Sequence, residues 1–77
     1  MQTFCAHRDQ IVAALSEKFQ ENLTSLGLLS ETQLLEIFVS SSGSWTAVIS
    51  NSIDAMTCIM AAGQDWQLVQ QAIGTPL

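Results

Sequence analysis

The chain has 77 residues, of which 48% are hydrophobic and 12% charged, and its net charge is −5. A chain this short, residues 1–77, gives a single domain with a small core, so we expect a cross-link or association with another chain to add to its stability. The acidic balance argues against nucleic acid and anionic lipid as partners, and no apolar run approaches the roughly 18 residues that cross a bilayer.

The first predicted element is an amphipathic helix from Ala6 to about Gln20. Asp9 in its first turn and Lys18 in its last turn complement the helix dipole, and Asn22 follows as the expected stop. Apolar residues recur at three- and four-residue steps along one side of this segment: Ile11, Val12, Leu15 and Phe19.

An antiparallel sheet is predicted to follow the helix. Apolar residues recur at every second position in the segments 34–40, 45–50 and 56–63, which is the period of a strand. The serine- and glycine-rich residues 40–44 and residues 51–54, which include Asn51 and Asp54, are typical of the turns between them. A shorter strand within 24–29 would precede these three, although Gly27 weakens that segment. We therefore expect a meander of three or four strands.

The residues after the sheet predict a short C-terminal helix. Asp65 is a capping residue, apolar residues follow at helical spacing, and Gly74 and Pro76 end the pattern. A helix followed by a sheet indicates the α+β class, with the N-terminal helix packed across the meander. We expect one face of the sheet to remain uncovered and to carry apolar residues such as Phe38 and Val48.

Cys5 and Cys58 are the most informative pair of residues. A helix packed across the sheet could bring the two thiols within bonding distance, and the resulting loop of about 54 residues would contribute about 4 kcal/mol by constraining the unfolded chain. One alternative is two buried free thiols in a reducing cytosol. Another is a copper(I) or zinc site formed by Cys5, His7 and Cys58.

The expected disulfide bears on the compartment. The first residues, Met1 to Phe4, have neither the basic nor the apolar region of a signal peptide. Because disulfides persist mainly in oxidising compartments, we expect a mature periplasmic or secreted domain whose leader was replaced by an initiating methionine. A cytoplasmic location accompanies the free-thiol alternative.

The sequence contains no arrangement that selects a catalytic set. His7 is the only histidine, so a hydrolytic triad would have to use it with an aspartate such as Asp9, Asp54 or Asp65, and no spacing favours one of them. We expect neither enzymatic activity nor a cofactor.

Trp45 and Trp66 are the candidate binding residues. Each offers a flat aromatic face to a sugar or a peptide. Trp45 is in register with Ala47 and Ile49, which also suits a core position between sheet and helix. Trp66 suits an interface, where tryptophan is enriched.

Several blocks of the chain resemble a group of small uncharacterised bacterial proteins, and the likeness spans about residues 5–66. The resemblance implies a mature domain that follows a signal peptide, with the two cysteines at corresponding positions, and therefore export and a disulfide. It implies no activity. The blocks are Cys5-Ala6-His7-Arg8-Asp9, Leu15-Ser16-Glu17-Lys18-Phe19, Leu35-Glu36-Ile37-Phe38-Val39, Gly43-Ser44-Trp45-Thr46 and residues 57–66.

The leading functional hypothesis is a non-enzymatic interaction or structural module of the periplasm. Its low charge and surplus of apolar residues favour binding to a protein partner or to a second copy of itself, as a homodimer. Phe38, Trp45 and Trp66 are the interface candidates. The alternatives are a soft-metal protein that uses Cys5, His7 and Cys58, and a small-ligand binder that uses the two tryptophans.

Overall fold

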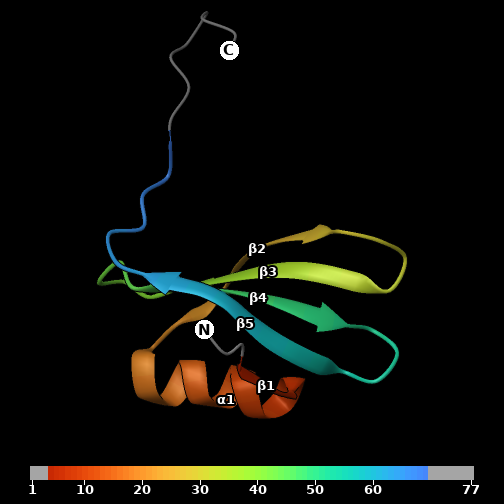
Figure 1. The fold of residues 1–77 in the computed structure, drawn as a ribbon. Coiled ribbons are helices and arrows are strands. Elements are labelled where there is room, and N and C mark those ends of the chain that lie inside the picture. Colours follow the sequence, from red (N-terminus) through yellow and green to blue (C-terminus); the bar gives the residue numbers. More distant parts are fainter. Residues whose placement is uncertain (1–3, 70–77) are drawn as a thin grey trace, which may run out of the picture.

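The computed structural model describes residues 4–69 as one α-helix packed on a five-stranded antiparallel sheet (Figure 1). The strand order is β1-β5-β4-β3-β2. The α+β class and the packing of the helix on the sheet are confirmed, whereas the expected number of strands was too low. The elements are β1 (Phe4–His7), α1 (Arg8–Phe19), β2 (Asn22–Leu28), β3 (Gln33–Val39), β4 (Trp45–Asn51) and β5 (Met56–Gly63).

The strand that sequence reasoning missed is β1. It has four residues and pairs with β5, so that Cys5 lies opposite Cys58. A segment of four residues has too few positions to display a period of two, and its extended state depends on this distant neighbour. The helix therefore begins at Arg8, two residues after the expected start at Ala6. His7 caps α1, because its Nδ1 accepts a hydrogen bond from the Asp9 N–H at 3.3 Å.

The helix ends at Phe19, close to the expected end at about Gln20. Gln20 adopts the left-handed conformation with φ 53°, and its N–H donates to the carbonyl of Ser16 at 3.1 Å. This geometry closes the last turn. Asn22, the expected stop, instead begins β2.

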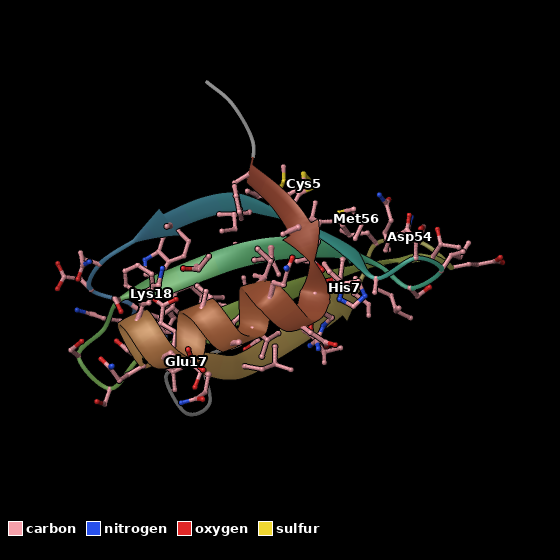
Figure 2. All side chains as sticks on the ribbon, turned by 90° about the horizontal axis from the view of Figure 1, so that it is seen from below. Cys5, His7, Glu17, Lys18, Asp54 and Met56 are labelled. Carbon is pink, nitrogen blue, oxygen red and sulfur yellow. A yellow bond between two sulfur atoms is a disulfide. The ribbon has the colours of Figure 1, made fainter. Side chains whose placement is uncertain are left out.

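The core lies between α1 and one face of the sheet. Ile11 and Leu15 of the helix pack with Phe38 of β3 and Val48 of β4, each at most 4% exposed. Figure 1 shows α1 below the sheet, and Figure 2 views the molecule from that side with α1 in front of the strands. The expectation that Phe38 and Val48 lie on the uncovered face was wrong. Strand periodicity shows which residues share a face, but the helix contacts decide which face is covered.

The segment after β5 folds back over the turn between β3 and β4. The backbone N–H of Trp66 donates to the carbonyl of Gly43 at 2.9 Å. Residues 65–69 are irregular, so the predicted C-terminal helix is wrong for this stretch, and the remainder of that prediction lies outside the described residues. The one helix of residues 4–69 is too short to cross a membrane.

Candidate functional site

The sheet face opposite α1 is apolar, and we call it the open face. Its side chains form rows that run across the strands in register. None of them is Asp, Glu, Lys or Arg. Polar residues without charge, including Asn22, Ser25, Gln33 and Asn51, lie at its margins. The rows are Leu35, Ile49, Cys58 and Cys5; Ile37, Ala47 and Ala61; and Val39, Trp45 and Gly63.

The residues at the middle of the open face are only partly shielded from solvent. Leu35, Ile37, Val39 and Ile49 are half-buried, and the shielding comes from their cross-strand neighbours because α1 lies on the other face. Apolar side chains without charge form the centre of protein interfaces, and a contiguous patch of them marks an interaction site.

Trp45 and Trp66 meet at one end of the open face. Their ring centroids are 5.6 Å apart with an interplanar angle of 56°, a tilted arrangement that aromatic pairs favour. The indole N–H of Trp45 donates to the carbonyl of Gln64 at 3.2 Å. Gly63 leaves room for this ring, because a Cβ at that position would lie 2.9 Å from the indole.

The structure therefore brings the two predicted aromatic residues together, but not in the core beneath the helix. Trp45 shares a face with Ala47 and Ile49 as expected, and that face is the open one. The Nε1 of Trp66 is buried and has no hydrogen-bond acceptor among residues 4–69. Phe38, the third interface candidate, is 2% exposed beneath α1, which leaves it no surface for contact with a partner.

The predicted disulfide between Cys5 and Cys58 is confirmed. The two residues are directly opposite each other on β1 and β5, with their Cα atoms 4.0 Å apart. The bond therefore joins two strands, and the expected link from the first helix to the last strand was wrong. Neither cysteine is a free thiol, which contradicts the free-thiol alternative.

The disulfide also bears on the soft-metal alternative. Both sulfur atoms of the proposed ligand set are in the bond, so Cys5 and Cys58 could act as thiolates only after reduction. His7 lies at the junction of β1 and α1, and Met56 is its cross-strand partner (Figure 2). Within residues 4–69, no three side chains of the His, Cys, Asp or Glu type are grouped so as to hold a metal ion.

A partly buried ion pair lies on the helix-covered face, with Glu36 buried and Arg8 partly exposed. The Arg8 guanidinium donates to both carboxylate oxygens of Glu36, at 3.2 Å from Nε to Oε1 and 2.6 Å from Nη2 to Oε2. The Ser50 hydroxyl donates to Oε1 at 2.6 Å, and Ser50 is also hydrogen-bonded to Thr57 at 2.9 Å. Sequence reasoning did not find this network. The feature of the sequence that could have indicated the network is Glu36, the only charged residue among the apolar residues 34–39.

These contacts control the ionisation of Glu36. Hydrogen bonds from Arg8 and then from Ser50 lower the pKa of Glu36, in opposition to burial, which raises it. The hydrogen bond with Glu36 likewise raises the pKa of Arg8. Both carboxylate oxygens of Glu36 are hydrogen-bonded, so the network is suited to hold α1 on the sheet rather than to transfer protons.

A pocket of about 420 Å³ lies between the C-terminal end of α1 and strands β4 and β5. Leu15, Phe19 and Ile59 form its apolar wall, and Glu21 and Thr46 supply polar groups. The Thr46 hydroxyl donates to Oε1 of Glu21 at 2.7 Å. The sequence did not predict this pocket, because its lining comes from segments that are far apart in the chain.

Comparisons of this chain with protein families, curated proteins and solved structures find no match. The resemblance to small exported bacterial proteins therefore stays a prediction.

Proposed function

We propose that this protein is a non-enzymatic interaction module of a periplasmic or extracellular compartment, and that it binds a second copy of itself through the open face. The observation that carries the proposal is the absence of charge from the described part of that face, combined with its apolar rows and its tryptophan pair. Aromatic residues are enriched and charges depleted at the centres of protein interfaces.

The distribution of charge favours a second copy as the occupant. The chain has a net charge of −5, and the charged residues of the described segment lie on α1, on the helix-covered face, or outside the helix and strands, where Asp65 follows β5 next to Trp66. If two open faces pack together as in a β-sandwich, the charge-free surfaces meet and the two helices remain on the outside. Such an isologous contact is the commonest form of dimer. It keeps the acidic groups of the two chains apart.

The disulfide supports a periplasmic or extracellular location. Bonds of this kind are maintained outside the reducing cytosol, and Cys5 is exposed to solvent, where a cytosolic reductant would reach it. The soft-metal alternative would require reduction of this same bond, so we favour the interaction module.

The test is the association state of the oxidised chain, measured by sedimentation equilibrium. We expect a wild-type dimer. The variant Ile37→Lys places a charge at the centre of the open face and should weaken association by about a hundredfold or more, because burial of an unpaired charge costs several kcal/mol. Ala13→Lys is the matched control, since it adds the same charge at an exposed position of α1 and should leave the dimer intact.

Two results would overturn the proposal. A wild-type chain that remains monomeric at a concentration of about 1 mM would exclude a second copy as the occupant of the open face. Equal association of the Ile37→Lys and wild-type chains, with unchanged circular dichroism spectra, would show that any dimer uses another surface.

A further inference from the structure

We infer that the pocket at the end of α1 binds a small organic ammonium compound, with Glu21 as its counter-ion. The pocket lies between α1 and strands β4 and β5, and its lining includes Trp45 and Gly63, which also belong to the open face. The test therefore includes a variant that separates ligand binding from association through that face.

Glu21 lines the pocket and supplies its carboxylate. Glu21 is 3% exposed, and its only side-chain hydrogen bond within residues 4–69 is the one from Thr46 to Oε1. No cation pairs with it in that part of the chain, because Arg8 is paired with Glu36 and Lys18 is exposed on α1. The Oε2 atom of Glu21 accepts no hydrogen bond within residues 4–69 and is not enclosed by the protein, so this oxygen is available to a cation in the pocket.

The size and lining of the pocket suit a small organic molecule. Its volume of about 420 Å³ is within the range of roughly 300–1,000 Å³ that small-molecule sites occupy. Apolar groups of Leu15 and Ile59 form the wall, and Phe19 is 54% exposed beside them instead of filling the core. An aromatic ring attracts a cation, and more strongly where water is excluded.

These two properties define the ligand. An apolar body would contact Leu15, Phe19 and Ile59, and a single ammonium group would donate a hydrogen bond to Glu21. Neutral compounds of the same shape would leave the carboxylate without a counter-ion. Anionic compounds would be repelled by it.

The test uses three probes of similar shape: 2-phenylethylammonium, 2-phenylethanol and 3-phenylpropionate. Each is titrated at neutral pH into the full-length oxidised chain and followed by amide chemical shifts in nitrogen-15 NMR spectra. We expect saturable shifts around Thr46 and Ile59 with the ammonium. We expect the alcohol to bind at least about tenfold more weakly than the ammonium, since a charge-assisted hydrogen bond is lost. The carboxylate should give no saturable shifts.

Three variants locate the effect. Glu21→Gln keeps the shape of the side chain and an oxygen for the Thr46 hydroxyl, and it should weaken ammonium binding by about tenfold or more. Glu17→Gln removes the same charge from an exposed position of α1 (Figure 2) and should change nothing. Ala62→Phe narrows the pocket from β5 without a change in charge, so it should weaken binding of the ammonium and of the alcohol alike.

The inference fails if the alcohol binds as well as the ammonium, if Glu21→Gln binds the ammonium as the wild type does, or if no probe gives saturable shifts up to about 10 mM. Repetition of the titration in the Ile37→Lys variant separates this outcome from the association state. Ammonium binding in a monomeric Ile37→Lys chain would support the pocket as a ligand site, whether or not the wild-type chain associates through the open face.

Discussion

Glu36 shows how a single residue ties the helix to the sheet. Glu36 is 2% exposed, and its carboxylate is neutralised by Arg8, the first residue of α1. Removal of one partner from a buried pair is more costly than the pair itself is stabilising, because the remaining charge is left uncompensated. Ser50 adds a third hydrogen bond to the carboxylate. A glutamate is therefore favoured at position 36 by its contacts with Arg8 and Ser50, although strand periodicity alone would favour an apolar residue there.

The ionisation of Glu36 predicts a pH-dependent stability. Its pKa is lowered in the folded state, so its contribution is fully present above the ordinary glutamate value of about 4.3 and is lost as pH falls through the lower folded pKa. We expect Glu36→Gln to lower the free energy of unfolding at pH 7 by about 2 kcal/mol, a figure reduced because Arg8 is partly exposed. The loss should shrink toward pH 2. Urea denaturation at a series of pH values measures it.

The control for this prediction is Glu17→Gln, which removes an exposed carboxylate from the same helix. Its effect on the free energy of unfolding should be small at every pH. If Glu36→Gln were equally destabilising at pH 7 and at pH 2, the ionised carboxylate would not be the source of its contribution.

At the scale of the elements, the two edge strands are held in different ways. β2 pairs with β3 over most of its seven residues, whereas β1 has four residues and depends on β5 alone. The disulfide anchors this short strand, and α1 follows it directly. The hydrogen bond from the Arg8 N–H to the carbonyl of Ala55, at 2.8 Å, holds the junction.

Reduction of the disulfide should therefore act on one edge of the sheet. The bond closes a loop with a sequence separation of 53 residues, and its loss should lower the free energy of unfolding by about 4 kcal/mol in the chain-entropy description. Hydrogen exchange in the Cys5→Ser/Cys58→Ser double variant should be faster in β1 and at the start of α1 than in the wild type. The lower global stability should speed exchange in every strand, and exchange in β2 should rise by no more than this global effect. Equal acceleration throughout the sheet would contradict a local role.

At the scale of the whole molecule, the one Asp, Glu, Lys or Arg side chain of the described strands, that of Glu36, lies on the side of the sheet that α1 covers. The helix side carries the ion pair and the Glu21 pocket, while the open face carries apolar rows and the tryptophan pair. The composition predicted a surplus of apolar surface. Only the fold shows where this surplus lies: the open face carries apolar rows without charge, which suits association, and Leu23, Leu26 and Leu28 of β2 are exposed on the helix side of the sheet.

The proposed compartment predicts the thiol state of the whole chain in its own cells. Protein isolated without reductant should have an intact mass lower by two hydrogen atoms than the reduced chain, and it should take up no alkyl groups under denaturing, non-reducing conditions. Alkylation of both cysteines would contradict the oxidising compartment. Copurification of a metal with such an alkylated protein would favour the soft-metal alternative.

The candidate sites were only partly predictable from the sequence. Cys5 and Cys58 were found because cysteines in a short chain are few, and Trp45 and Trp66 because tryptophan favours interfaces. Glu21 and Phe19 gave no comparable signal, since the pocket exists only where the end of α1 approaches β4 and β5.

The sequence by itself determined the α+β class, the central strands and the sets of residues that share a face, because these follow from periods of two and 3.6 residues between near neighbours. Tertiary structure alone decided that Phe38 and Val48 are covered while Ile37 and Ile49 are open. It also decided that Cys5 lies in a strand and that Glu36 meets Arg8. The physical reason is that each of these outcomes depends on contacts between residues far apart in the chain, which no local pattern records.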